Sequence, residues 1–196
     1  MSGNNNNSDN LVDKFFGKYR GIVTDNQDPL KLGRIRAKIP VVFGENDSGW
    51  ALPCAPYAGK NVGFFCIPPI DALVWIEFES GNPEIPIWTG GFWKDGETPD
   101  ESASPDIKIL KTDTNTIKLD DTSGSENITI ETNAGLKIIL NQDGIEATCA
   151  ENITIETNAG LKIILNQDGI ELSNSSQKIK IASSNVSIND GALEVM

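Results

Sequence analysis

Residues 126–146 read ENITIETNAGLKIILNQDGIE, and residues 151–171 repeat the same 21 letters. The copies are offset by 25 residues, and the spacer between them is Ala147-Thr148-Cys149-Ala150. An identical repeat at a fixed period indicates one structural unit stacked on a copy of itself. The nature of that unit decides the fold of this half of the chain.

Within each copy, isoleucine and leucine alternate with polar residues. The first copy carries Ile128 and Ile130, then Leu136, Ile138 and Leu140, then Ile145, and the same residues recur 25 positions later. A period of two is typical of short strands with one apolar face. The segments 132–135 (TNAG) and 141–144 (NQDG) have turn composition, because Gly supplies positive φ and Asn and Asp tolerate it. Ile139 and Ile164 have the opposite parity and are expected to point outward.

The alternation extends beyond the exact copies. Strand starts recur from residue 107 to residue 193, which predicts about eleven short strands, and no segment there has helical spacing. Residues 101–196 contain no aromatic residue and no proline after Pro105. Each strand offers two or three aliphatic side chains, so one chain has too little apolar surface to offset the entropy of ordering this region.

Two arrangements solve this packing problem. A single chain can coil into a β-solenoid, or several chains can wind together so that their Ile and Leu stripes meet on a shared axis. Rungs of two or three aliphatic residues, with nothing bulky inside, favour an intertwined trimer with a narrow three-fold core. Eleven strands stacked at about 4.8 Å would make a rod on the order of 50 Å long.

The first 100 residues are built differently. They hold all of the Phe, Trp and Tyr residues and nine of the ten prolines. We predict strands at 15–25, 32–39, 62–67, 72–79 and 85–92, with a loop at 44–60, and hence a small closed five-stranded barrel. The expected organisation is a flexible segment at 1–14, a barrel at 15–93, a linker at 94–105 and a β-stranded rod at 106–196.

Charge and composition exclude several functions. The net charge is −12, and an acidic surface repels phosphate backbones, which argues against nucleic-acid binding. Arg34, Arg36 and Lys38 share one predicted strand face, which we interpret as a solvated face or a protein contact. No signal peptide or membrane-spanning run is predicted. The three cysteines lack the spacing of a metal site and are expected to be free thiols. Cys149 is a possible exception, because a trimer would hold its three copies near one level.

The chain also resembles a known family. The carrying stretches are GKYRGIVTDNQDPLKLGRIRAKIP (17–40), SGWALPCAPYAG (48–59) and PPIDALVWIEFESGNPEIPIWTGGFW (68–93). Within them lie Arg20-Gly21, Asp28-Pro29, Leu32-Gly33-Arg34 and Glu77-Phe78-Glu79-Ser80-Gly81. They look like the OB-fold domain of central spike proteins of contractile tails, including phage baseplate spikes and the gpV and VgrG proteins. Residues 115–140 resemble the start of that family's triple-stranded β-helix.

The resemblance implies an all-β homotrimeric needle: a five-stranded OB-fold barrel followed by a trimeric intertwined β-helix (β-prism). Its OB domains would attach to a separate baseplate hub protein, and sheath contraction would drive the spike through a target membrane. The protein would be made in the bacterial cytoplasm and assembled into the baseplate of a phage virion or phage-tail-like particle.

Departures from the family pattern refine this expectation. The linker leaves no room for the lysozyme domain of some relatives, and a chain without His cannot close its apex with a histidine-bound metal. No cofactor or metal is expected. A blunt trimer end would expose an unpaired apolar edge, so we predict that a PAAR-type tip protein contacts Leu193, Glu194, Val195 and Met196.

Two other functions are compatible with parts of the sequence. A trimeric β-helical tailspike that binds or cleaves polysaccharide needs paired carboxylates beside a sugar-binding cleft. Asp120, Asp121, Glu131 and Glu156 supply carboxylates, but no aromatic residue after 100 could stack on a sugar. The absence of His excludes Ser/His and Cys/His nucleophiles, so no enzymatic activity is expected. An OB-fold nucleic-acid binder with a trimerising tail is the third reading.

Overall fold

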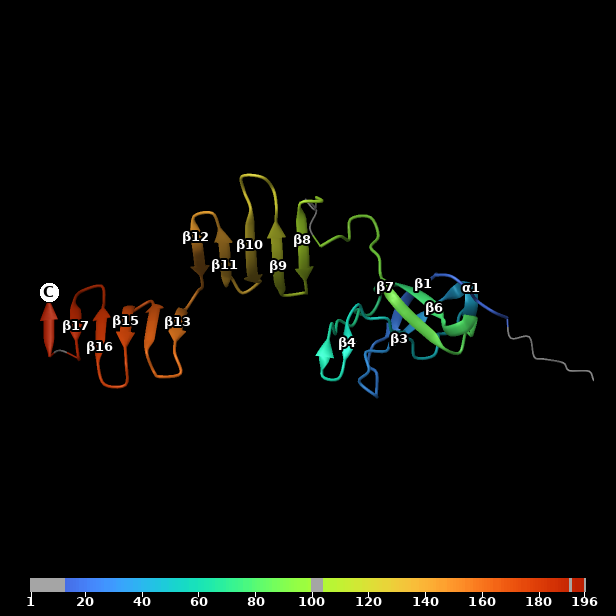
Figure 1. Ribbon diagram of the computed structural model, residues 1–196, viewed down its shortest axis with the longest axis horizontal. Helices are drawn as coiled ribbons and strands as arrows, with labels where there is room; N and C mark the ends of the chain where they lie inside the picture. Colours follow the sequence, from blue (N-terminus) through green and yellow to red (C-terminus); the bar gives the residue numbers. More distant parts are fainter. Residues whose placement is uncertain (1–12, 100–103, 191, 196) are drawn as a thin grey trace, which may run out of the picture. The chain divides into compact units, whose positions relative to one another are not determined.

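A computed structural model describes residues 13–99, 104–190 and 192–195 (Figure 1). The predicted flexible segment therefore falls mostly outside the described residues. The chain forms two compact units, Met1–Glu97 and Thr98–Met196. Both are built almost entirely of strands, which confirms the predicted all-β class. In the part of the chain that the structure describes, no helix is long and apolar enough to cross a membrane.

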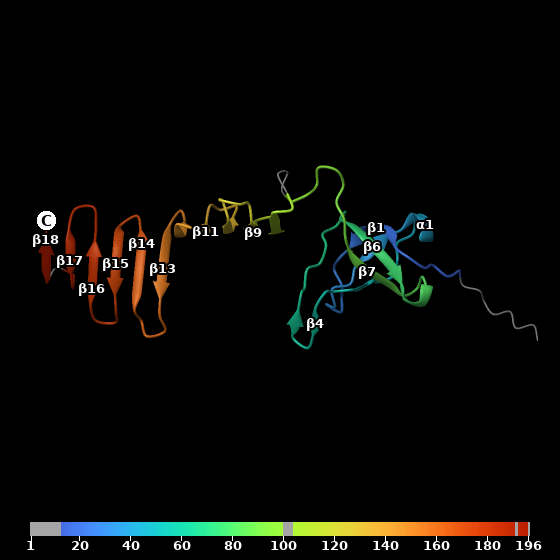
Figure 2. The same cartoon turned by 45° about the horizontal axis from the view of Figure 1, so that its top comes forward.

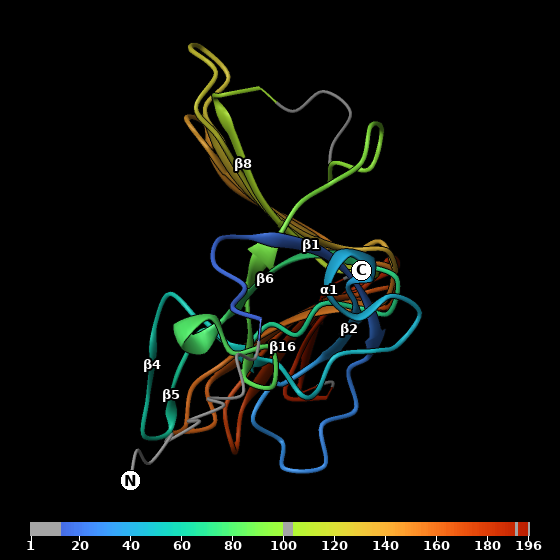
Figure 3. The ribbon, with the colours of Figure 1, turned by 90° about the vertical axis from the view of Figure 1, so that its right-hand side faces the viewer.

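The first unit is a small barrel (Figure 3). Its sheet has the order β2-β1-β6-β7-β3. The barrel closes between its two edge strands, where Ile35 and Ala51 exchange two backbone hydrogen bonds of 3.2 and 2.8 Å. The strands are β1 (Tyr19–Asp25), β2 (Arg36–Lys38), β3 (Leu52–Pro53), β6 (Leu73–Phe78) and β7 (Pro86–Gly91).

Alternation along the sequence explains the barrel core. Ile35, Ala37 and Ile39 are completely buried, whereas Leu32 and Arg36 are exposed, as the predicted strand faces require. Val23, Ala51, Val74, Ile76 and Phe78 complete the core. Strand β1 lies close to its neighbours at Gly21, where an added Cβ would lie 3.1 Å from the Ile76 side chain.

The third strand was predicted at the wrong place. Residues 62–67 (VGFFCI) form no barrel strand; only Val62–Gly63 (β5) is extended, and it pairs with Ala58–Gly59 (β4) in a separate two-stranded hairpin. The barrel instead uses β3, inside the predicted loop 44–60, and one helical turn follows β2 at Pro40–Phe43 (α1). A short apolar run has the composition of a buried strand, but composition alone does not show whether the segment joins the core.

The second unit consists of two antiparallel meanders. The first has the order β12-β11-β10-β9-β8 and the second the order β13-β14-β15-β16-β17-β18. Figure 2 shows the second meander as one layer. The eleven described strands agree with the prediction and are β8 (Ile107–Lys111), β9 (Asn115–Asp120), β10 (Asn127–Thr132), β11 (Lys137–Asn141), β12 (Gly144–Thr148), β13 (Asn152–Glu156), β14 (Lys162–Asn166), β15 (Gly169–Ser173), β16 (Lys178–Ile181), β17 (Val186–Ile188) and β18 (Leu193–Val195).

The register aligns the aliphatic residues into two rows on one face of the second meander. Directly paired residues in adjacent strands lie on the same face. One row is Ile153, Leu165, Ile170, Ile181, Val186 and Val195, and the other is Ile155, Ile163, Leu172, Ile179, Ile188 and Leu193. We call this surface, with its counterpart on β9–β12, the apolar face.

The two sequence copies fold alike. Ile128 pairs with Leu140 in the first copy, and Ile153 pairs with Leu165 in the second. Ile139 and Ile164 pair with Glu146 and Glu171 on the opposite, outer face, as their parity predicted. Strand β8 departs from the pattern, because Ile109 pairs with Lys118 on the outer face and Leu110 is the residue that joins Ile117.

Removal of one repeat tests this stacked architecture. Deletion of residues 126–150 joins β9 directly to β13. The connection between these two strands then has the same sequence as the present connection between β9 and β10. We expect a folded protein with a shorter rod and an unchanged number of chains, because β13 can pair with β9 in the register of β10. Light scattering and far-ultraviolet circular dichroism measure this. Aggregation, or a monomer, would contradict the stacked-unit interpretation.

Candidate functional site

The apolar face is an extended surface that the described residues leave uncovered. Several of its residues on interior strands are 37–44% exposed, among them Ile163, Ile179 and Leu172. By contrast, Thr129 on the outer face is only 8% exposed. A single-layer sheet with one apolar face is not stable until another layer covers that face. The geometry therefore makes the apolar face an association surface.

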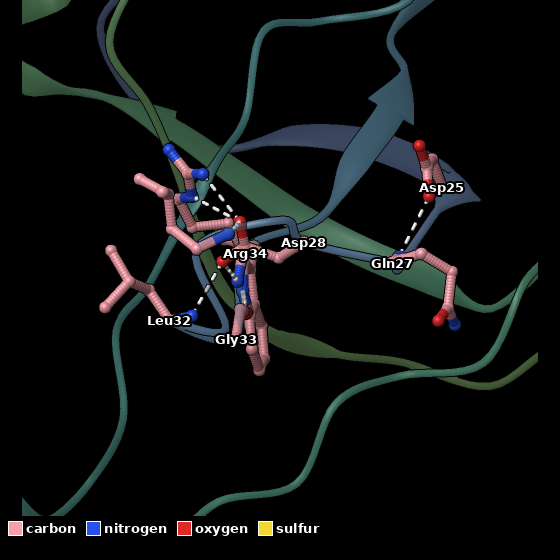
Figure 4. Close-up of polar contacts among 8 residues, drawn as sticks. Asp25, Gln27, Asp28, Leu32, Gly33 and Arg34 are labelled. Carbon is pink, nitrogen blue, oxygen red and sulfur yellow. Dashed lines mark hydrogen bonds and ion pairs between the residues drawn. The ribbon is translucent and has the colours of Figure 1, made fainter.

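A second feature organises the barrel at its β1–β2 connection (Figure 4). The Asp28 carboxylate, whose side chain is 2% exposed, accepts hydrogen bonds from the backbone N–H groups of Leu30 (3.0 Å) and Leu32 (2.7 Å). Arg34 donates to the same carboxylate from Nε (3.1 Å) and Nη2 (2.6 Å). This network folds the DPLKLGR segment into one rigid loop.

The electrostatics of this loop follow from its hydrogen bonds. The Arg34 guanidinium, supported by three backbone N–H groups, holds the pKa of Asp28 well below its usual range. Asp28 in turn raises the pKa of Arg34. The carboxylate is therefore ionised throughout the physiological range, and its role is structural.

The basic residues of the β2 face are already engaged within the chain. Arg34 binds Asp28, and Lys38 binds Glu45 at 2.6 Å. Arg34 and Arg36 lie 5.5 and 5.1 Å from the centre of the Trp50 ring. Their charge is therefore partly neutralised and their side chains are held in place, which weakens the nucleic-acid interpretation of this face.

The tryptophans pack rather than form a sugar platform. Trp88 packs against the core and donates from Nε1 to the Gly33 carbonyl at 3.1 Å. Trp75 lies against Phe92 with ring centres 4.6 Å apart. Trp93 is 63% exposed and borders a pocket of about 420 Å³ with Arg20, Ile22 and Lys94.

A third surface was missed from the sequence. The hairpin arm, residues 54–70, extends from the barrel around β4 and β5 (Figure 1). Its large apolar side chains are exposed: Tyr57, Val62, Phe64, Phe65, Ile67 and Ile70. A two-stranded hairpin has no core of its own. The signal was present, since FFCIPPI places bulky residues beside helix- and strand-breaking prolines.

The predicted tip-contact residues lie on an edge strand. Leu193, Glu194 and Val195 form β18, the outermost strand of the second meander, and Leu193 is 56% exposed. Met196 lies outside the described residues. Cys54 and Cys66 are exposed and Cys149 is half-buried, and all three are free thiols. Among residues 13–99, 104–190 and 192–195, no cluster of His, Cys, Asp or Glu could hold a metal.

Comparison with known proteins agrees with both units. Residues 19–93 match a family described as the type VI secretion system/phage-baseplate injector OB domain. Residues 107–152 and 147–194 each match the phage baseplate V C-terminal trimerisation domain. These two matches correspond to the two meanders. The chain is also 33% identical over 93 residues to actin cross-linking toxin VgrG1 of Vibrio cholerae serotype O1 (strain ATCC 39541 / Classical Ogawa 395 / O395), which covers 43% of this chain and 8% of that protein.

The Asp28 network predicts how the barrel responds to substitution and pH. Asp28→Asn removes the charge that accepts the Arg34 and backbone donors, so the barrel should melt on the order of 5–10 °C lower at pH 7. All four tryptophans lie in this unit, so their fluorescence reports its unfolding. Asp25 is half-buried and accepts one bond from the Gln27 N–H, and Asp25→Asn provides a matched control with little effect.

The pH dependence follows from the lowered pKa of Asp28. Its stabilisation is fully present above the unfolded pKa of about 4 and is lost as the pH falls toward the folded pKa. The melting-temperature gap between wild type and Asp28→Asn should therefore narrow between pH 5 and pH 2. A gap that stayed constant over this range would refute the electrostatic role.

Two neighbouring residue pairs, one on each face of the sheet, test the apolar face. Ile163 and Leu172 are paired on it, whereas Ile164 and Glu171 are paired on the outer face. The double substitution Ile163→Asn and Leu172→Asn should abolish assembly, since each buried side chain lost costs about 2–5 kcal/mol. The control, Ile164→Asn with Glu171→Asn, should keep its native mass by light scattering. Equal behaviour of the two variants would exclude the apolar face as the interface.

Proposed function

Because the chain belongs to the family of phage baseplate V spike proteins, which is related to the VgrG injector proteins, we propose that it is a homotrimeric needle that pierces a target cell envelope when a sheath contracts. The family is a structural component of baseplates and injection systems. The puncturing role, the hub attachment and the absence of catalysis are parts of this proposal, as are synthesis in the bacterial cytoplasm without a signal peptide and incorporation into a phage or phage-tail-like particle.

The carrying observation is the apolar face with its two aligned rows. Three copies placed around a common axis would bury both rows of each chain against one another. At each level along the axis, one strand from each chain would then contribute two aliphatic side chains, which makes six. A trimer also fits the match to a trimerisation domain. No other covering layer is supplied by residues 104–190 or 192–195, whose strands all belong to the two meanders.

The same arrangement would resist mechanical load. In a meander, each strand is hydrogen-bonded to its neighbour along its whole length, as β9 is to β10 through six residue pairs. Strands at a spacing of about 4.8 Å give the first meander a length of roughly 20 Å along the stacking direction. Compression along this direction acts on all the hydrogen bonds between two neighbouring strands at once. The aliphatic core keeps water away from these hydrogen bonds.

For attachment to the hub, we assign the hairpin arm. The arm carries six large exposed apolar residues and one charged residue, Lys60. Apolar patches of this kind mark protein interaction sites. The arm leaves the barrel at a well-ordered base, where Asn26 donates to the Pro68 carbonyl at 3.1 Å and Asp71 N–H donates to Val23 at 3.0 Å.

At the other end, β18 offers an unpaired edge strand with the exposed Leu193. Exposed edges invite pairing with another chain. We propose that a small PAAR-type protein covers Leu193, Glu194, Val195 and Met196 and sharpens the apex. Contact with the target membrane would then be transient and made first by the cap.

The alternative, a polysaccharide-binding or polysaccharide-cleaving tailspike, has less support. Glu131 and Glu156 pair with Lys137 and Lys162 on the sheets at 3.9 and 3.5 Å, as solvated carboxylates do. The described rod contains no aromatic side chain beside them. Binding of isolated cell-surface polysaccharide by the purified trimer would favour the alternative over the needle.

The needle is tested in the assembled particle. Particles carrying Ile163→Asn with Leu172→Asn should contract without permeabilising target cells, because the trimer is lost. Particles carrying the outer-face control, Ile164→Asn with Glu171→Asn, should permeabilise normally. Full activity of particles with the first pair of substitutions would show that the trimeric rod is not the piercing element.

The arm assignment is tested separately. Phe64→Ser with Phe65→Ser should weaken hub binding at least tenfold in a titration with purified hub protein, because two exposed aromatic anchors are lost. Leu30→Ser, an exposed apolar residue outside the arm, is the control. Unchanged hub affinity with native trimer mass would place the hub contact elsewhere.

A further inference from the structure

One connection between strands of the second unit differs from all the others. Nine of the ten connections between consecutive strands from β8 to β18 contain Asn, Asp or Gly. The connection from β12 to β13 is Cys149-Ala150-Glu151, which contains none of them. Short hairpin loops are stabilised by a residue in the left-handed region or by a side chain that accepts from the turn backbone. In the other three-residue connection, Thr112-Asp113-Thr114, the Thr112 hydroxyl accepts from the N–H groups of Thr114 and Asn115. Cys149-Ala150-Glu151 contains no Gly, Asn, Asp, Ser or Thr, so it lacks the turn-stabilising residues of the other connections.

The sheet breaks at this connection. Strand β10 pairs with β9, but the equivalent strand of the second copy, β13, has no pairing with β12. Both are edge strands within the described residues. At the break, Ile145 on β12 is 76% exposed and Ile155 on β13 is 60% exposed, compared with 37–44% for Ile163, Leu172 and Ile179 on interior strands, whereas Ile153 at the other end of β13 is half-buried.

On the basis of the proposed trimer, we propose that strands are exchanged between chains at this connection. Strand β12 of each copy pairs with β13 of the next copy around the three-fold axis. Each copy contributes one β12 edge and one β13 edge. Cyclic exchange among three copies satisfies all six edges and leaves none exposed, as a closed heterologous interface requires. No other protein is needed to cover them.

The direction of pairing follows from the missing turn. A chain that does not reverse at Cys149-Ala150-Glu151 continues around the axis in the same sense. By three-fold symmetry, the strand that it meets on the next face also runs in that sense, so the exchanged pair is parallel. Four residue steps from Thr148 to Asn152 span at most about 14 Å, enough to turn a corner of a narrow prism.

The exchange gives the rod two kinds of strand pairing, one within each chain and one between chains. Above and below the junction, each chain builds its own antiparallel ladder, as β8–β12 and β13–β18 show. At the junction, Ile145 and Ile155 gain neighbours from other copies, and the three chains become interlocked. One chain cannot then leave the rod without breaking two interchain ladders.

Crosslinking tests the exchange. The natural thiols are first removed with Cys54→Ser, Cys66→Ser and Cys149→Ser. Glu146→Cys then places one thiol on β12, and Thr154→Cys places one on β13. Both new thiols lie on the outer face, where Glu146 pairs with Ile139 and Thr154 pairs with Ile164. Treatment with a short bis-maleimide, followed by denaturing electrophoresis, should give covalent species of two and three chain masses. Glu146→Cys alone should give none, and Ile139→Cys with Glu146→Cys, which are paired within one chain, should give only intrachain links.

The native mass of the same sample separates the possible failures. A trimer whose thiols link only within one chain, or not at all, overturns the exchange and leaves the needle intact. A monomer overturns the needle itself. As a second variant, Ala150→Asn with Glu151→Gly supplies the missing turn residues and should lower the interchain yield several-fold in an intact trimer. An unchanged yield would contradict the turn-chemistry argument.

Discussion

The structure depends on one constraint: an antiparallel meander with two rows of aliphatic side chains on a single face must be covered. On interior strands the backbone hydrogen bonds are satisfied within the sheets, so backbone pairing there demands no partner. The apolar face does, because side chains such as Ile163 and Leu172 remain more than a third exposed even on interior strands. The hydrophobic effect therefore drives the association of chains, because burial of these side chains is favourable.

The barrel solves the opposite problem within one chain. Its strands close at Ile35 and Ala51, and its core is complete without a partner. Asp28 and Arg34 fix the connection that precedes β2, which holds Gly33 where the Trp88 indole can donate to it. The barrel therefore folds around its own core, and the arm adds six large apolar side chains that this core does not bury.

Much of this architecture was predictable. The alternation of Ile128, Ile130, Ile138 and Leu140 predicted strands and faces, and the turn residues between them predicted the connections, since both depend on local chemistry. The outward position of Ile139 followed from parity alone. The misplaced third strand shows the limit of such reasoning, because VGFFCI has the composition of a buried strand and yet lies in an exposed arm. Composition alone therefore does not show whether an apolar segment joins the core.

By itself, the sequence determined the all-β class, the repeat, the strand parity and the need for an apolar partner, because each follows from short-range spacing. Only the tertiary structure decided which strands pair, where the barrel closes and where the meander breaks. Pairing register is a long-range choice between strands of similar composition, as the two identical copies demonstrate: β10 pairs with the strand before it and β13 does not. The connections that precede the two copies differ: residues 121–126 contain Asp and Gly, whereas Cys149-Ala150-Glu151 contains no Asn, Asp or Gly, so only the first carries residues that favour a turn.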